Sequence, residues 1–164
     1  MKKWLIITCC IIVVLAFISV LFIERKKAVE SDDGYNVPNY KVQDVSTREE
    51  KNLFDLLDDS PKVLIRLINS GCTPCHVEQA KLLKELSDTE NLIVLVNSIN
   101  LRPIRIFLRE NNIRMPIYCL KETDVLLPND DQTKLLILHV DENGTILTIQ
   151  YAEPPFNRNL VAVV

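Results

Sequence analysis

The sequence lacks several features that would indicate other classes of protein. Residues 28–164 hold 14 Lys and Arg against 21 Asp and Glu, so the chain lacks the basic surplus that binding to nucleic acid requires. Internal repeats and low-complexity segments are also absent, and 164 residues leave room for one domain. The sequence therefore predicts a single folded domain whose partner is not nucleic acid.

Small residues of the Ala-x-Ala kind are missing from the end of the long apolar run near the N-terminus. This run, residues 4–23, contains no charged residue, and Lys2 and Lys3 precede it. A helix of that length crosses the core of a bilayer, whereas a cleaved signal peptide has a shorter apolar region that ends in small residues. We therefore predict an uncleaved membrane anchor, made of residues 1–27 with their flanking basic residues.

Beyond the anchor, the apolar pattern predicts a polar tether over residues 28–45 and an α/β domain over residues 46–164. The segment Ser46-Thr47-Arg48-Glu49-Glu50 is typical of a capping box and predicts the start of a short helix. Helices are expected from Pro74 to Ser87 and from Asn100 onward, and a hairpin turn at Asp141-Glu142-Asn143-Gly144. Strands are expected over residues 62–68, 91–97, 117–120, 134–140 and 145–151. This order, with helices between parallel strands, defines the α/β class.

The segment Cys72-Thr73-Pro74-Cys75 holds the closely spaced cysteines, and two kinds of metal chemistry have to be weighed for it. A zinc site needs two more ligands, but His76, His139 and Cys119 are scattered along the chain. With His76 the pair also fits the attachment motif of a c-type haem, for which Met115 or His139 could supply a second axial ligand. A metal at this position would have to recruit ligands from distant elements.

A redox-active dithiol accounts for the position of the same two cysteines. Cys72 falls at the N-terminus of a predicted helix, where free backbone N–H groups and the helix dipole stabilise a thiolate. Cys75 follows one turn later, close enough to resolve a mixed disulfide formed by Cys72. The pattern therefore favours thiol–disulfide exchange, with Cys72 as nucleophile and Cys75 as resolving thiol.

The predicted strand over residues 62–68, the cysteine segment and the following helix resemble the active-site segment of thioredoxin-like proteins. The branch that is most similar comprises the membrane-anchored, TlpA-like and peroxiredoxin-like thiol–disulfide oxidoreductases of bacterial envelopes. Residues 106–120 and 136–147 extend the resemblance, which covers about residues 46–151. It implies a thioredoxin-like fold, in which helices flank a central mixed sheet.

The same resemblance implies a setting for the reaction. It places the chain in the bacterial inner membrane as a single-pass protein, with its catalytic domain facing the periplasm or the cell exterior. It implies protein thiols and disulfides as partners, an upstream thiol reductant, and no cofactor apart from a redox-active Cys72–Cys75 disulfide. Three residues next to the cysteines, Thr73, Pro74 and His76, are candidates for tuning the thiols or binding substrate.

The sequence departs from the family pattern at three positions. Gly71 stands where the residue before the first cysteine is usually Trp, and Arg66 stands where thioredoxins keep a buried acid. Arg66 could lower the pKa of a nearby thiol, or its side chain could extend to the rim of the sheet. The cis-proline that faces the cysteines in this fold corresponds either to Pro116 or to a position near Leu135 that holds no proline.

Two other functions remain open from the sequence. A thioredoxin-like binding module without turnover would explain Arg66, Gly71 and a missing cis-proline, and a haem c electron carrier would use the Cys-x-x-Cys-His motif. Cys119 could be a third redox thiol, although a lone cysteine in an apolar strand is more typical of core packing.

Overall fold

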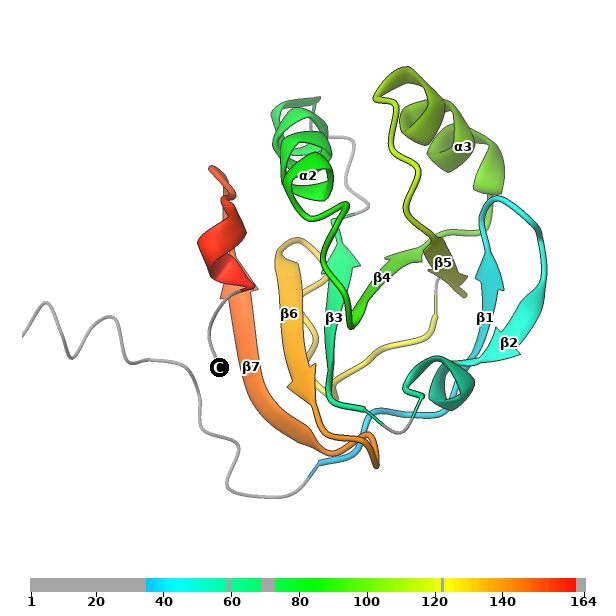
Figure 1. Cartoon of the computed structure of the whole chain (residues 1–164), viewed down its shortest axis with the longest axis vertical. Helices are drawn as coiled ribbons and strands as arrows, with labels where there is room; N and C mark the ends of the chain where they lie inside the picture. Colours follow the sequence, from blue (N-terminus) through cyan, green and yellow to red (C-terminus); the bar gives the residue numbers. More distant parts are fainter. Residues whose placement is uncertain (1–34, 59, 69–72, 122, 162–164) are drawn as a thin grey trace, which may run out of the picture. The chain divides into compact units, whose positions relative to one another are not determined.

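The computed structural model describes residues 35–58, 60–68, 73–121 and 123–161. Within these ranges, seven strands form one mixed sheet in the order β2-β1-β5-β4-β3-β6-β7 (Figure 1). The strands are β1 (Lys41–Asp44), β2 (Glu50–Asn52), β3 (Lys62–Leu67), β4 (Leu92–Asn97), β5 (Ile117–Leu120), β6 (Leu135–Val140) and β7 (Ile146–Ala152). The helices are α2 (Thr73–Glu85) and α3 (Leu101–Glu110), with short 3-10 turns η1 (Leu53–Leu56) and η2 (Arg158–Leu160).

The interior strand β3 pairs with β4 on one side in parallel and with β6 on the other side antiparallel. The strand β5 extends the parallel part next to β4, and β1 and β7 are antiparallel to their neighbours. Because β3, β4 and β5 run in parallel, their carboxyl ends lie at the same edge of the sheet. The chain therefore leaves β3 toward α2, and β4 toward α3, at one common edge, here called the carboxyl edge.

Helices cover one face of the sheet. The side chains of Ile65, Val94 and Ile137 point toward α2 and α3 and pack against Leu83 and Leu108 in one buried cluster. Figure 1 shows α2 and α3 side by side above the strands. We call this side the helix face.

The opposite face of the sheet, here called the loop face, is covered without a long helix. On this side Leu64, Leu95 and Leu138 pack against Leu53 of η1 and against Leu126, which lies between β5 and β6. Strict alternation along β3, with Leu64 on one face and Ile65 on the other, is what an interior strand buried on both faces requires. The sheet therefore separates two apolar cores.

The order of elements from β3 to β7 confirms the sequence prediction, and so does the hairpin turn before β7. In that turn Gly144 has a φ of +80°, and its N–H donates to the carbonyl of Asp141 at 3.1 Å. A Cβ at Gly144 would lie 3.3 Å from the ring of Phe54. Glycine is therefore required there both for its backbone conformation and for the close approach of η1.

The prediction for residues 35–52 was wrong. The predicted tether contains β1, and its Val37 and Val42 are buried. The predicted capping box instead forms the turn between β1 and β2, because the carboxylate of Asp44 accepts hydrogen bonds from the N–H groups of Ser46 and Thr47 at 2.7 and 2.8 Å. The folded region therefore begins earlier than residue 46, and the described helical segment nearby is the single turn η1.

Candidate functional site

Thr73, Pro74 and Cys75 form the first residues of α2, the helix that follows β3 at the carboxyl edge. Cys75 is the third residue of α2, is partly buried, and is disulfide-bonded. The first turn of α2 carries no acidic side chain, so nothing on that turn opposes the positive end of the helix dipole. Cys72 and Gly71 lie outside the described residues, so the pairing of Cys72 with Cys75 remains a prediction.

Three other residues of the motif belong to the start of α2. Thr73 is the first residue of the helix, and Pro74 follows in the first turn, where its missing N–H is not needed. Pro74 and His76 are exposed. The ring of His76 faces α3, with its centroid 5.9 Å from that of Phe107.

A small apolar cavity of about 80 Å³ lies between α2 and α3, directly beside the cysteine turn. His76 and Phe107 line it from the two helices, and Ile68 and Val96 line it from the ends of β3 and β4. Two exposed hydrophobic side chains, Val77 at 52% exposure and Ile99 at 83%, lie on α2 and on the loop before α3 at the same edge. The apolar groups nearest to Cys75 in the described structure are therefore the lining of this cavity and the exposed Val77 on the same helix.

Gln79 is a residue of this site that the sequence prediction missed. Its side chain is 2% exposed, and its two polar atoms both bind the backbone of Ile68. The Ile68 N–H donates to Gln79 Oε1 at 3.1 Å, and Gln79 Nε2 donates to the Ile68 carbonyl at 3.3 Å. A signal was present in the sequence, because Gln79 shares the helical spacing of the buried residues Leu82 and Leu83 on α2.

Arg66 does not extend to the rim of the sheet, because it is 1% exposed and lies on the loop face. Its Nη2 donates to Asp130 Oδ1 at 2.7 Å, and it also reaches the carbonyls of Asp131 at 3.1 Å and Lys134 at 3.3 Å. The side chain of Asp130 is itself fully buried. The guanidinium charge is therefore paired with a carboxylate and holds the segment that leads into β6.

Pro116 lies away from the cysteines, at the opposite edge of the sheet. It precedes β5 at the amino end of the parallel strands, in a surface hollow that Lys62, Asn91 and Tyr118 also line. Within the described residues the cis peptide bond is Pro154–Pro155, so Pro116 is not a cis-proline. The alternative position, near Leu135, does lie at the carboxyl edge, because Leu136 pairs with Arg66 of β3, and no proline occupies it.

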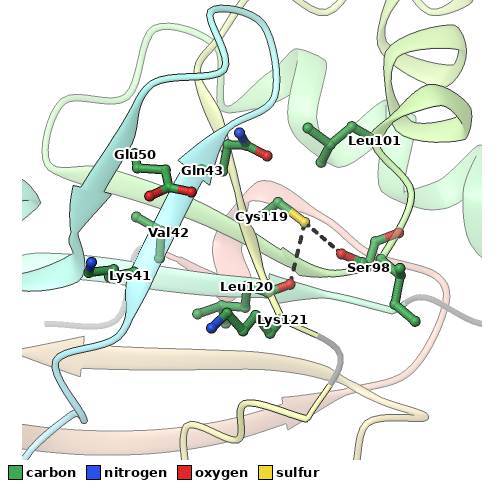
Figure 2. Close-up of a pocket in the computed structure, with 10 residues that line it drawn as sticks. Lys41, Val42, Gln43, Glu50, Ser98, Leu101, Cys119, Leu120 and Lys121 are labelled. Carbon is green, nitrogen blue, oxygen red and sulfur yellow. Dashed lines mark hydrogen bonds between the residues drawn. The ribbon is translucent and has the colours of Figure 1, made fainter.

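Cys119 is separate from the cysteine turn and lies in a cavity of about 460 Å³ between β1 and the start of α3 (Figure 2). Its Sγ donates to the carbonyls of Ser98 at 3.1 Å and Leu120 at 3.3 Å. Burial raises the pKa of the Cys119 thiol, and the hydrogen bond to Ser98 offsets this only in part. A buried thiol with a raised pKa is a poor nucleophile, which favours the core-packing interpretation.

The candidates for the second axial ligand do not fit a c-type haem attached through the Cys72–Cys75 motif with His76 as the first axial ligand. Met115 precedes β5 at the amino edge, and His139 pairs with Val63 near the beginning of β3, also at the amino edge. Neither of these candidate axial ligands faces the cysteine turn. A search for groups of three or more metal-ligating side chains found none among the described residues.

Comparison with known proteins identifies the fold. No family model matches the sequence, and no curated protein matches it. Solved structures do match: a peroxiredoxin-like protein from Aquifex aeolicus has a TM-score of 0.56 at 18% identity, covering 79% of this chain and 83% of its own. The thioredoxin domain of a thiol-disulfide oxidoreductase from Bacteroides vulgatus has a TM-score of 0.53 at 16% identity, covering 77% and 93%.

A DsbF homologue from Corynebacterium diphtheriae also matches, with a TM-score of 0.53 at 17% identity, covering 76% of this chain and 83% of its own. Within the described ranges, no helix has the length and hydropathy needed to cross a bilayer. The predicted anchor, residues 4–23, lies outside those ranges. The sheet order, the helices and these neighbours confirm the resemblance inferred from the sequence: the chain has a thioredoxin-like fold.

Proposed function

We propose that this chain is a membrane-anchored thiol–disulfide oxidoreductase that uses Cys72 and Cys75 to exchange disulfides with other proteins. The observation that carries the proposal is the disulfide-bonded Cys75 in the first turn of α2, directly after the interior strand β3 of a thioredoxin-like sheet. A helix N-terminus favours the thiolate form of a cysteine, which is the nucleophile in thiol–disulfide exchange.

The reaction proceeds in two exchanges. In the reduced protein, the Cys72 thiolate attacks one sulfur of a substrate disulfide, forms a mixed disulfide and releases the other substrate sulfur as a thiolate. The Cys75 thiol then loses its proton and attacks Cys72 Sγ, which releases the second substrate thiolate and leaves a Cys72–Cys75 disulfide. Two electrons have passed to the substrate, and an upstream thiol reductant or a substrate dithiol returns the pair to its reduced form by the reverse steps.

The proposed partners are protein thiols and disulfides. The apolar cavity between His76 and Phe107 and the exposed Val77 and Ile99 would receive a protein segment next to its disulfide. Thr73 and Pro74, at the start of α2, are the remaining candidates for contact with that segment. No nucleic acid is expected as a partner, because the region after the anchor is acidic.

The redox activity can be tested on the full chain in detergent, with Cys9→Ser and Cys10→Ser as background. Equilibration in glutathione buffers, followed by alkylation and mass spectrometry of the peptides, should show a two-electron transition shared by Cys72 and Cys75. A Cys75→Ser variant should accumulate mixed disulfides that a Cys72→Ser variant cannot form. A pair that never changes between thiol and disulfide would contradict the proposal and leave a thioredoxin-like binding module.

The proposed location is the bacterial inner membrane, with residues 4–23 as a single span and the domain in the periplasm or outside the cell. The full chain should remain with the membrane fraction after an alkaline carbonate wash. A variant without residues 4–23 should be released. External protease should then degrade the domain in intact spheroplasts, and protection of the domain would show the opposite orientation.

A further inference from the structure

The buried amide of Gln79 connects the two elements on either side of the cysteine turn. Ile68 is the last described residue before residues 69–72, and Gln79 lies one turn of α2 beyond Cys75. Both polar atoms of one side chain bind both polar groups of one backbone residue, at 3.1 and 3.3 Å. Cys72 and Cys75 therefore lie within a loop of chain that these two hydrogen bonds close.

The polar groups of Ile68 lie just beyond the end of β3. The ladder of β3 with β6 ends at the pair Arg66–Leu136. Leu67 and Ile68 both pack in the buried cluster of the helix face, so the alternation of the strand has ended at Ile68. Gln79 satisfies the polar groups of Ile68 at the point where the chain leaves the sheet, which buried backbone groups require.

A primary amide is well suited to this position. It offers one acceptor and two donors, so it can serve an N–H and a carbonyl at the same time without a charge. The cavity that Gln79 helps to line is otherwise apolar except for His76, so a charged side chain would lose hydration there. The carboxylate of a Glu could accept from the Ile68 N–H but could not donate to the Ile68 carbonyl.

We propose that Gln79 is a positioning residue for the redox pair: it fixes the cysteine turn against α2 and thereby sets the thiol–disulfide equilibrium. The inference rests on the proposed function. When the two hydrogen bonds are lost, Ile68 is no longer fixed to α2, and the loop of chain that contains the two cysteines is no longer closed by them. The stabilisation of the Cys72 thiolate by the helix N-terminus then falls, and the relative stability of the dithiol and the disulfide changes.

The test compares Gln79→Met and Gln79→Glu with the wild type in the same full-length chain. The equilibrium constant with glutathione should change in Gln79→Met by about threefold to tenfold, the range that corresponds to the net contribution of one hydrogen bond. In Gln79→Met, the pH dependence of the alkylation rate of Cys72 should show a higher pKa of the Cys72 thiol than in the wild type. In Gln79→Glu near pH 7, the ionised carboxylate repels the carbonyl oxygen of Ile68. The glutathione equilibrium constant of this variant should therefore differ from that of the wild type at least as much as that of Gln79→Met does.

The Glu variant also supplies a signature that a general loss of stability would not give. A protonated carboxyl group has one donor and one acceptor, and burial raises its pKa. As the pH falls toward about 5, the ratio of the Gln79→Glu equilibrium constant to that of the wild type should therefore return toward one. The ratio for Gln79→Met should stay constant over the same range.

Asn111→Ala is the matched control. The Asn111 side chain makes a comparable hydrogen bond, from Nδ2 to the carbonyl of Phe107 at 2.9 Å, but at the far end of α3. It should lower stability without changing the glutathione equilibrium. If the wild type cycles and both Gln79 variants keep its equilibrium constant and the alkylation profile of Cys72, the positioning role is wrong. If the wild type does not cycle, the proposed function itself fails.

Discussion

The two faces of the sheet are held together by different kinds of contact. On the helix face, α2 and α3 satisfy their own backbone groups, and mainly apolar side chains pack between helices and strands. On the loop face, the segment between β5 and β6 is irregular, and two buried side chains of the sheet, Arg66 and Asn97, donate to its backbone carbonyls. The irregular covering layer is therefore held by buried polar side chains of the strands, whereas on the helix face the buried amide of Gln79 binds the backbone where the chain leaves β3.

The largest expected effect is on the loop face, at the ion pair of Arg66 with Asp130. Arg66→Met leaves a fully buried carboxylate without its partner and removes the donor to the carbonyls of Asp131 and Lys134. Loss of one partner of a buried pair costs about 3–5 kcal/mol. Urea unfolding of the variant should show a decrease of that order in the free energy of unfolding.

Two further variants separate the charge from the geometry. Arg66→Met combined with Asp130→Leu should be more stable than Arg66→Met alone, because no unpaired charge remains buried. Arg66→Lys keeps the charge but loses the planar group that reaches several acceptors, so it should fall between Arg66→Met and the wild type. If the double variant is less stable than Arg66→Met, Arg66 stabilises the protein by something other than its ion pair with Asp130.

A smaller effect is expected at Asn97, the other polar anchor of the loop face. Its Nδ2 donates to the carbonyl of Lys121 at 3.0 Å and to that of Asp124 at 2.6 Å. Asn97→Leu leaves both carbonyls without this donor, which should lower the free energy of unfolding by about 1–3 kcal/mol. Hydrogen exchange should also accelerate in residues 123–134 more than in α2, and equal acceleration on both faces would contradict the local role.

The sequence predicted the helix face better than the loop face, and the reason is physical. The spacing of apolar residues along the sequence predicts the strands β3 to β7 and both helices, because it indicates which residues of each element are buried. The partner of Arg66 lies 64 residues away, in a segment that has no periodicity. No local pattern could therefore distinguish a buried Arg66 from one that extends to the solvent.

The errors near the cysteine turn have similar causes. Gln79 occupies an apolar position of a helix, and its partner is a backbone group whose position depends on how β3 ends. Pro116 has the spacing of a cis-proline along the chain, yet the parallel pairing of β5 with β4 places it at the amino edge. Spacing along the sequence predicts which elements form, whereas the edge at which a residue lies depends on the sheet topology.

On the helix face, the buried His139 should make the free energy of unfolding depend on pH. It is 5% exposed, and burial lowers its pKa below the usual value of 6.5. The unfolded chain therefore binds a proton at a pH where the folded chain does not, so the free energy of unfolding should decrease as the pH falls below about 6.5. It should recover as the pH rises again.

Urea unfolding at pH values of about 7.5 and 5.5 checks this dependence. His139→Leu should lose less stability between the two conditions than the wild type. The matched control is His76→Gln, because His76 is the other histidine of the chain and is exposed. The His76→Gln variant should keep the pH dependence of the wild type. If it loses that dependence, the effect comes from His76 and not from His139.

The smallest effect is expected at Cys119, a weakly polar group on the helix face. Its thiol donates to the Ser98 carbonyl, but Cys119 is also part of the apolar cluster around Val96 and Ile117. Cys119→Ala should therefore lower the free energy of unfolding by only about 1 kcal/mol and leave the glutathione equilibrium of Cys72 and Cys75 unchanged.

In the wild type, Cys119 should react with iodoacetamide only after the chain unfolds, because burial raises the pKa of its thiol and blocks access to it. Rapid labelling in the native protein, or a changed equilibrium in Cys119→Ala, would make it a third redox thiol. The helix face would then hold a thiol that takes part in disulfide exchange, in addition to the apolar side chains that pack there.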